Sequence, residues 1–388
     1  MRIVHILTRL LRAGSEENTL LTCSGQLDHG HEVYLLYGHD SAPEPVRRAL
    51  PDLGLVAIPA LTREISPLKD ASAFSQIRKV LKEIKPDVVH THQSKAGIVG
   101  RFAAAAAGVP LVVHGVHILP FLGESGAKKA IYLASERAAA RVTDGFIHVS
   151  EGIRESCLAH KVGTDRPHHV VRSGFDLDRF ANAERPVDWP ELVGPDEEND
   201  KPLVVSMLSA LEPRKNHLGL LNHLGPLFAR FPETRILFAG EGHLREQIAA
   251  KLRDLGLQDR VGLLGYRDDP ERIIALSDIC LHCAEREGLP RSVLQYIAGG
   301  RPVVLFDLPG IDDVLHDGQN AVIIPAGNWT ALIDALLRLL GDPPARAHLA
   351  SGARSTDLGR WDAATMGRDT IAIYHELLGN KQRQPRVA

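Results

Sequence analysis

Residues 279–304 read ICLHCAEREGLPRSVLQYIAGGRPVV and set the fold class of the chain around them. The apolar run that ends at Ala284 predicts a buried strand, and a glycine-containing turn follows it. Pro290 stands where the first residue of a helix tolerates proline, so we expect a helix over residues 291–298. A strand followed by a turn and a helix is typical of a parallel sheet with crossover helices.

The same alternation of short apolar runs and helical segments continues on both sides of this stretch. Strands are expected over 1–7, 32–37, 87–90, 111–114, 203–208, 235–239, 261–264 and 279–283, and helices over 18–27, 73–84, 97–107, 217–231 and 244–255. Residues 184–201, rich in proline and acidic residues, predict an interdomain linker. We therefore expect an α/β fold with two doubly wound parallel-sheet domains, 1–183 and 202–360, facing a central cleft. Open α/β sheets bind ligands at the carboxyl ends of their strands.

Composition narrows the class of protein. The chain has 388 residues, 44% of them hydrophobic, and a net charge of -3, so it lacks the basic footprint of a nucleic-acid binder. No apolar run is long enough to span a bilayer, and the N-terminus does not resemble a signal peptide, which predicts a cytoplasmic protein. The four cysteines are scattered, and Cys280 and Cys283 lie in an apolar run, so buried thiols are favoured over a disulfide framework or a zinc site.

The helix over 291–298 suggests a ligand. Its amino end, reached through Gly288, Leu289 and Pro290, offers backbone N–H groups and a positive dipole end to a phosphate. Glu287 just before it would then face sugar hydroxyls instead of phosphate. The alternative is that Glu287 only complements the helix dipole and Gln295 is a surface residue. Neither half of the chain contains G-x-G-x-x-G or G-x-x-x-x-G-K-[ST], so nicotinamide and P-loop sites lose their usual support.

Several motifs resemble those of one family. They are E-G-x-P-x-x-x-L from Glu287, A-x-G-x-P-V-V from Ala298, and the segments 90–101, 114–117, 174–180, 211–215, 240–242, 309–313 and 317–320. In this order they are similar to the family-4 retaining glycosyltransferases of the GT-B architecture. The resemblance implies transfer of a sugar from a nucleotide-diphosphate donor to a glycan, lipid-linked or other hydroxyl acceptor, with retention and without metal or cofactor. It also implies that the last helix, within 361–388, returns toward the N-terminal domain.

The resemblance also implies a donor site in the C-terminal domain. Lys215 matches the lysine that supports the donor diphosphate, but Ala210 stands where the family has arginine. Arg214 either replaces that charge or is solvated. Gln295 stands where the family has a glutamate that binds the ribose, and an amide oxygen accepts that bond without charge assistance.

In the N-terminal domain the resemblance assigns a glycine loop and a histidine. Gly14 and Ser15 match a loop that closes over the donor phosphates. His117 matches a histidine near the transferred sugar, and we expect it to face Glu287 across the cleft as the catalytic pair. His92 and Lys95, within the matched run 90–101, are assigned to the acceptor.

Two features allow more than one interpretation. His90, His92, His114 and His117 share a strand periodicity that suits a metal, but no acidic or cysteine pair completes a set, so we expect none. Residues 123–142 carry Lys128, Lys129, Arg137 and Arg141 and either touch anionic lipid or the acceptor, or form a packing helix. The first interpretation predicts peripheral contact with the inner face of the membrane.

Two other functions are compatible with the sequence. A nucleotide-sugar epimerase or hydrolase of similar fold would release nucleotide without an acceptor. A degenerate, non-catalytic nucleotide-sugar-binding protein is compatible with Ala210 and Gln295, although Lys215, Glu287 and His117 argue for a working site.

Overall fold

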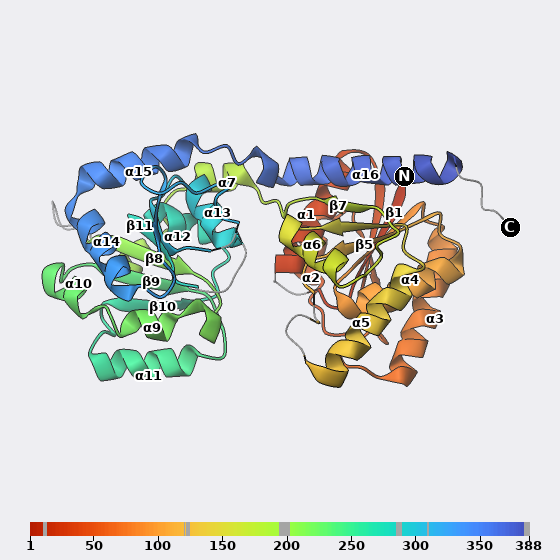
Figure 1. Ribbon diagram of the computed structural model, residues 1–388, viewed down its shortest axis with the longest axis horizontal. Helices are drawn as coiled ribbons and strands as arrows, with labels where there is room; N and C mark the ends of the chain where they lie inside the picture. Colours follow the sequence, from red (N-terminus) through yellow and green to blue (C-terminus); the bar gives the residue numbers. More distant parts are fainter. Residues whose placement is uncertain are drawn as a thin grey trace. The chain divides into compact units, whose positions relative to one another are not determined.

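The computed structural model describes residues 1–10, 14–119, 121, 125–193, 202–284, 289–308 and 310–383. They form two compact units, Met1–Phe175 with Gly359–Ala388 (unit 1) and Asp176–Leu358 (unit 2). Each unit has one sheet of parallel strands with helices on its faces (Figure 1). The predicted fold class of two parallel-sheet α/β domains is confirmed.

The sheet of unit 1 has seven described strands in the order β3-β2-β1-β4-β5-β6-β7. Their bounds are β1 Arg2–Leu7, β2 Glu32–Tyr37, β3 Gly54–Ala57, β4 Val88–His92, β5 Leu111–Val116, β6 Gly145–His148 and β7 His168–Val170. The strand order reverses between β1 and β4, which pair with His5 opposite His90. Such a switch point is where open α/β sheets bind ligands.

Helices cover both faces of this sheet. They are α1 Gly14–Asp28, α2 Glu44–Ala49, α3 Pro67–Ile84, α4 Ser94–Ala107, α5 Gly126–Ala140, α6 Glu151–Ala159 and, from the end of the chain, α16 Ala363–Arg383. On one face Ile77 of α3 and Ala103 of α4 pack against Val4 and Val89. On the other face Tyr374 of α16 packs against strand residues that include Val113. Both faces bury apolar strand residues, as expected for a parallel sheet.

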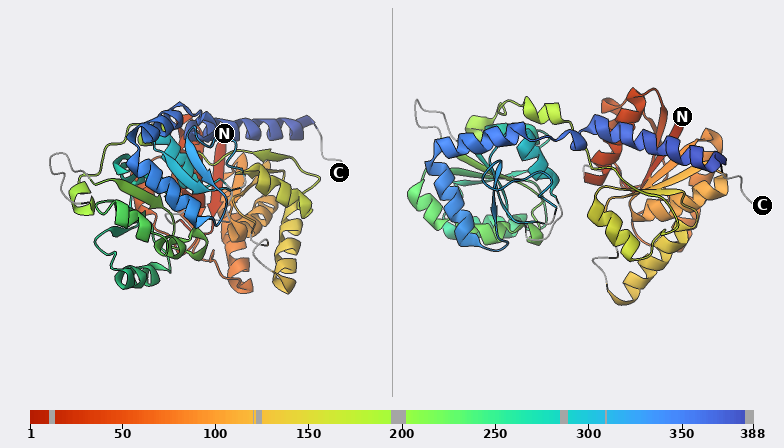
Figure 2. Two further views of the ribbon diagram at one scale, coloured as in Figure 1. Left: turned by 60° about the vertical axis from the view of Figure 1, so that its left-hand side comes forward. Right: turned by 45° about the horizontal axis from the view of Figure 1, so that its top comes forward.

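The last helix belongs to unit 1. The 3-10 turn η3 (Gly359–Trp361) leads into α16, and Phe175 holds this point by donating its N–H to the Trp361 carbonyl (2.9 Å) and accepting from the Ala363 N–H (3.0 Å). α16 then packs along α1, as the views of Figure 2 show. Gly25 and Gly367 meet where the two helices approach, because a Cβ on Gly25 would lie 3.2 Å from the Gly367 Cα.

The sheet of unit 2 has six described strands in the order β10-β9-β8-β11-β12-β13. They are β8 Val204–Leu208, β9 Arg235–Ala239, β10 Val261–Gly265, β11 Ile279–His282, β12 Val303–Phe306 and β13 Ala321–Ile324. The helical elements are α7 Leu177–Ala181, α8 Trp189–Val193, the 3-10 turn η2 Pro213–Lys215, α9 His217–Leu221, α10 Gly225–Arg230, α11 Arg245–Leu255, α12 Pro270–Leu276, α13 Arg291–Ala298, α14 Trp329–Gly341 and α15 Pro343–Ser355. The order reverses between β8 and β11, so the switch point of this unit lies there.

Local structure differs from the sequence prediction at four places. The two units divide after Phe175, not after 183, because α7 packs against α12 and α13. The predicted linker 184–201 contains α8, whose Val193 is buried with Leu237 and Leu276. The helix predicted over 217–231 is two helices, because Pro226 starts a new one. Gly14 and Ser15 begin α1 instead of forming a loop.

Candidate active site

In unit 2 the turn that carries Lys215 lies at the carboxyl ends of β8 and β11. The Asn216 side chain donates to the Cys283 carbonyl (3.1 Å), just after β11, and His217 Nε2 lies 3.3 Å from Ser209 Oγ, just after β8. Lys215 itself is buried. Desolvation, with the nearby Lys215 charge second, lowers the pKa of His217 to about 4. A lysine charge held at a sheet switch point suits an anionic ligand.

A glycine allows a neighbouring loop to pack against this turn. Gly240 follows β9 with a φ of 153°, and a Cβ on it would lie 2.0 Å from the Ser209 carbonyl oxygen. The Leu211 N–H donates to the Glu241 carbonyl (2.9 Å), which ties the two loops together. The motif 240–242 therefore shapes the loop that precedes Lys215.

Helix α13 is attached to the same edge of the sheet. The hydroxyl of Tyr296, which is fully buried, accepts a hydrogen bond from the Leu208 N–H at the end of β8 (2.7 Å). The helix spans Arg291–Ala298 with Pro290 as its N-cap residue, as the sequence predicts. Its amino end therefore follows β11 at the switch point, where backbone N–H groups can receive a phosphate.

The residues predicted to bind the donor differ in their burial and in their hydrogen-bond partners. Leu289 is half-buried, Pro290 is buried, and Gln295 is half-buried in the second turn of α13. Arg214 is half-exposed and its Nε donates to Glu212 Oε2 (2.9 Å), so a carboxylate already shares its charge. Glu287 and Gly288 lie outside the described residues. Their predicted roles stay predictions.

In unit 1 a row of imidazoles leads from the sheet interior to His117. His5 Nδ1 lies 2.9 Å from His92 Nε2, and His92 Nδ1 lies 3.0 Å from His117 Nε2. His117 directly follows β5 and is half-buried, whereas His5 and His92 are fully buried. At the inner end Gln26 Oε1 lies 2.8 Å from His5 Nε2.

Burial keeps this row uncharged. Desolvation lowers the pKa of both His5 and His117 to about 4. It lowers the pKa values of His90 and His92 well below the ordinary value, and neighbouring imidazoles act in the same direction. At neutral pH these groups therefore exchange hydrogen bonds as neutral imidazoles, each with one donor and one acceptor nitrogen.

The other site residues predicted in unit 1 form hydrogen bonds or ion pairs with side chains of the same unit. Both ring nitrogens of His92 face imidazoles and its side chain is buried, so direct contact with an acceptor does not fit this arrangement. Lys95 Nζ donates to Asp70 Oδ2 (2.6 Å). The lysine charge that the sequence analysis assigns to acceptor binding is therefore paired with Asp70. Ser15 Oγ accepts from the Gln93 amide (3.2 Å), whose oxygen accepts from the Thr8 N–H (3.0 Å). Gln93 thus joins the start of α1 to the end of β1.

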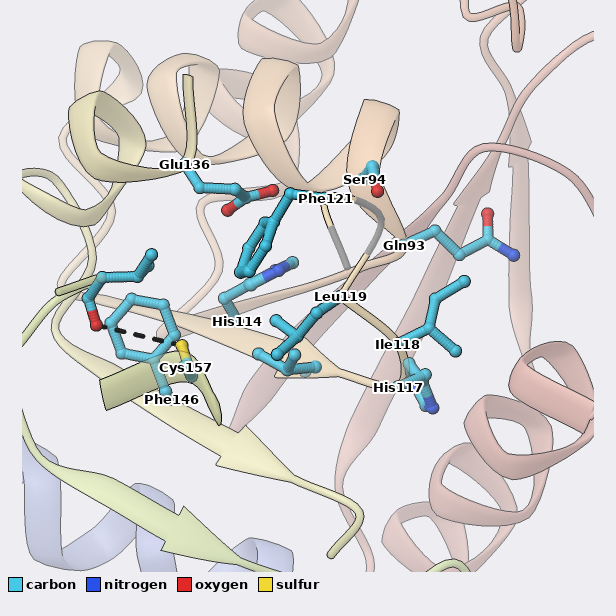
Figure 3. Close-up of a pocket in the computed structure, with 13 residues that line it drawn as sticks. Gln93, Ser94, His114, His117, Ile118, Leu119, Phe121, Glu136, Phe146 and Cys157 are labelled. Carbon is cyan, nitrogen blue, oxygen red and sulfur yellow. Dashed lines mark hydrogen bonds between the residues drawn. The ribbon is translucent and has the colours of Figure 1, made fainter. Parts of the chain in front are cut away.

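A small cavity of about 10 Å³ lies beside this row, lined by residues of β5, α5 and the segment after β5. In Figure 3 His114, Phe121 and Glu136 gather in it, and His117 stands at its edge. Glu136 pairs with Arg101, which is fully buried and donates from Nη2 at 2.6 Å. Arg101 also assists desolvation in lowering the pKa of His114. The cavity is too small for a sugar as it stands.

The buried histidines raise the question of a metal. His5, His90 and His92 place ligand atoms within 4.8 Å of one another, and so do His148, Cys157 and His168. The first group is already linked by the His5–His92 hydrogen bond, and His148 Nε2 lies 2.8 Å from His168 Nδ1. Burial also raises the pKa of the Cys157 thiol to about 12, whereas metals bind thiolates. A metal would have to displace these bonds.

Sequence reasoning missed the inner part of the row. It did not single out His5, although a histidine inside the apolar run RIVHIL is a detectable signal. Gln26 and Tyr374 give no such signal, because they are 348 residues apart and meet only when α16 packs on α1.

Comparisons with known proteins identify the class. Residues 13–174 match the family model of the glycosyl transferase 4-like domain, and residues 190–356 match that of glycosyl transferases group 1. The chain is 31% identical over 291 residues to the Escherichia coli UDP-Gal:alpha-D-GlcNAc-diphosphoundecaprenol alpha-1,3-galactosyltransferase, covering 74% of both chains. It is 27% identical over 381 residues to the phosphatidyl-myo-inositol mannosyltransferase of Mycolicibacterium smegmatis, covering 94% of this chain and 91% of the other.

A solved structure supports the same fold. The Anabaena protein Alr3699/HepE in complex with UDP and glucose has a TM-score of 0.79 and 19% identity, over 97% of this chain and 100% of that one. The fold is therefore that of the GT-B class. The chain belongs to the family-4 glycosyltransferases, enzymes that use nucleotide-sugar donors, and the predicted family and activity are confirmed. The epimerase, hydrolase and non-catalytic alternatives find no support.

Proposed function

We propose that this glycosyltransferase is retaining and metal-independent, and that it moves a sugar from a uridine-diphosphate donor to a lipid-linked glycan. The buried Lys215 at the β8–β11 switch point carries the proposal, since a fixed cation there stabilises the charge that develops on the leaving diphosphate. The Escherichia coli relative, which takes UDP-Gal as donor and alpha-D-GlcNAc-diphosphoundecaprenol as acceptor, suggests the UDP-sugar and the diphospholipid acceptor.

The chemistry needs no enzyme nucleophile. The bond from the anomeric carbon to the diphosphate oxygen breaks, and the acceptor oxygen bonds to that carbon on the same face. The departing phosphate oxygen takes the acceptor proton. His117 and Glu287 bind hydroxyls of the transferred sugar in this proposal, while Gln295 accepts from the ribose and the amides near Pro290 bind phosphate.

Binding and turnover measurements test the donor site. Lys215→Ala removes a charge-assisted contact, so UDP binding should weaken by about 1.5–3 kcal/mol, which raises the Kd roughly 10- to 150-fold. Lys82, exposed in the last turn of α3, provides the matched control Lys82→Ala, which should bind UDP normally. Unchanged UDP binding in Lys215→Ala would remove the basis of the proposal.

The stereochemistry and the metal requirement have separate tests. With an α-configured UDP-sugar, NMR of the product should show an α-glycosidic bond, and EDTA should leave the rate unchanged. A β-linked product would refute retention. Loss of activity to EDTA that is restored by a divalent cation would refute metal independence.

We also propose that the enzyme works at the cytoplasmic face of the membrane through α5. In the described part of the chain no helix has the length and apolarity to cross a bilayer. α5 exposes Lys128 and, one turn further along the same face, Ile131, whose exposed fraction is 59%. Basic and apolar groups on one surface suit anionic lipid.

Flotation with lipid vesicles tests this proposal. The double variant Ile131→Ser with Lys128→Glu should float less with phosphatidylglycerol vesicles, whereas its low binding to phosphatidylcholine vesicles should not change. Equal flotation of the variant and the wild type would contradict the proposal.

A further inference from the structure

The hydrogen bonds that link His117 to the interior of unit 1 all have the same donor-to-acceptor direction, and the buried amide of Gln26 sets that direction. Gln26 of α1 is fully buried, its Nε2 donates to the Tyr374 hydroxyl (3.3 Å), and its Oε1 faces His5 Nε2 (2.8 Å). An amide oxygen only accepts, so His5 must carry its proton on Nε2. His5 Nδ1 is then a bare acceptor.

The same reasoning passes from ring to ring. His5 Nδ1 accepts from His92 Nε2–H over 2.9 Å, which leaves His92 Nδ1 without a proton. His92 Nδ1 accepts from His117 Nε2–H over 3.0 Å. A neutral imidazole has only one N–H, so His117 Nδ1 is bare as well. Among the described residues no group bonds this nitrogen, and His117 is only half-buried.

We propose that Gln26, through His5 and His92, fixes His117 as the Nε2–H tautomer, so that His117 presents Nδ1 to the donor sugar strictly as a hydrogen-bond acceptor. Gln26, His5 and His92 are positioning residues, because they act through His117. The substrate group that His117 recognises is accordingly a hydroxyl that donates its proton. This inference rests on the proposed contact of His117 with the transferred sugar.

The hydrogen bonds of Tyr374 agree with this orientation of the Gln26 side-chain amide. Its hydroxyl lies 2.6 Å from His90 Nδ1, so it can accept from Gln26 and donate to His90 at the same time. His90 then carries its proton on Nε2, an atom with no partner among the described residues. His90 is one of the residues that line a cavity of about 20 Å³, a volume that holds one water molecule. The tautomer of His90, measured separately from that of His117, is therefore a second observable that reports the orientation of the Gln26 amide.

The packing holds the rings in place. His5 and His92 stack with centroids 5.2 Å apart, and His90 and His92 lie at 4.2 Å. Gly115 of β5 makes room for them, because a Cβ there would lie 2.8 Å from both His90 Nε2 and His92 Nδ1. The rings thus have little freedom to rotate and exchange partners.

The test is the tautomer of each histidine, measured by ¹⁵N NMR of protein labelled at histidine, with resonances assigned through His117→Asn and His90→Asn. In the unliganded wild type both residues should be Nε2–H. In Gln26→Met the acceptor is gone, so His117 should gain the Nδ1–H form, and kcat/KM should fall about three- to tenfold because the hydroxyl loses its acceptor. Tyr374→Phe, which releases the amide, should give a mixture of tautomers and serves if Gln26→Met does not fold.

Thr22→Val is the matched control. Thr22 is buried one turn before Gln26 and donates only to the Asn18 carbonyl (2.9 Å), so its loss should not change the tautomer. An Nδ1–H form of His117 in the wild type, or an unchanged tautomer in both Gln26→Met and Tyr374→Phe, would overturn the inference. Normal turnover of His117→Ala with the expected tautomers would instead defeat only the proposed contact of His117 with the sugar.

Discussion

Mild acid should unfold unit 1 well before unit 2. Unit 1 buries His5, His90, His92, His114 and His148 almost completely. Desolvation is the main cause that lowers the pKa of His5 to about 4 and of His148 to about 3, and the pKa values of the other three lie well below the ordinary 6.5. As pH falls below 6.5, these histidines take up protons in the unfolded chain but not in the folded one, so stability falls with pH.

The magnitude follows from the proton linkage. Between pH 7.5 and 5.5 each such histidine removes about 1.4 kcal/mol, and five remove about 7 kcal/mol, compared with about 5–15 kcal/mol for the stability of a whole domain. In unit 2, His217 contributes one such group, with a pKa lowered to about 4 and a loss of about 1.4 kcal/mol. The loss should continue as pH falls to about 4 for His5 and about 3 for His148, where these groups become protonated in the folded state as well.

Hydrogen exchange followed by mass spectrometry can measure the two units separately. After correction for intrinsic exchange rates, peptides of β1 and β4 should lose several kcal/mol of protection between pH 7.5 and 5.5, and peptides of β8 and β9 much less. His148→Gln should reduce the loss in unit 1 by about 1.4 kcal/mol, whereas His39→Gln, at an exposed position, should not change it. Equal losses in both units would refute the reasoning.

Three further substitutions have expected outcomes. Gln295→Glu should change the Kd for UDP with little change in Tm, because it supplies a charged acceptor at a half-buried position, and an unchanged Kd would contradict the ribose contact. Arg101→Met should cost about 3–5 kcal/mol in urea unfolding by leaving Glu136 buried and unpaired, and Glu136→Leu in addition should restore much of it. Tyr296→Phe should cost about 1–3 kcal/mol, since the Leu208 N–H loses its acceptor, and loss below 0.5 kcal/mol would mean that water replaces the hydroxyl.

The sequence predicted most elements that depend on local pattern. The strand at 32–37 and the helix at 291–298 have the predicted bounds, because a short apolar run and a proline at the helix start are local signals. The break within 217–231 was missed although Pro226 marks it, because the apolar periodicity continues across the break. The return of the chain to unit 1 came from the family resemblance, since no local pattern states which sheet α16 will cover.

The candidate site was less accessible to sequence reasoning. Lys215 was found through a motif, and the structure gives it a place at a switch point. Its neighbours Asn216 and Tyr296 act through single hydrogen bonds to Cys283 and Leu208, which only the folded chain brings into reach. Polar contacts between distant segments leave no periodicity in the sequence.

The row of imidazoles depends on strand register more than on any one histidine. His90 and His92 point to the same face of β4 because successive side chains alternate. The parallel register places His5 of β1 opposite His90, and Gly115 of β5 opposite His92. A shift of either neighbour by one residue would turn its side chains to the other face and separate His5 from His92. The hydrophobic strand residues that pack against α3, α4 and α16 therefore do more than stabilise unit 1: they fix the register on which the hydrogen bond to His117 depends.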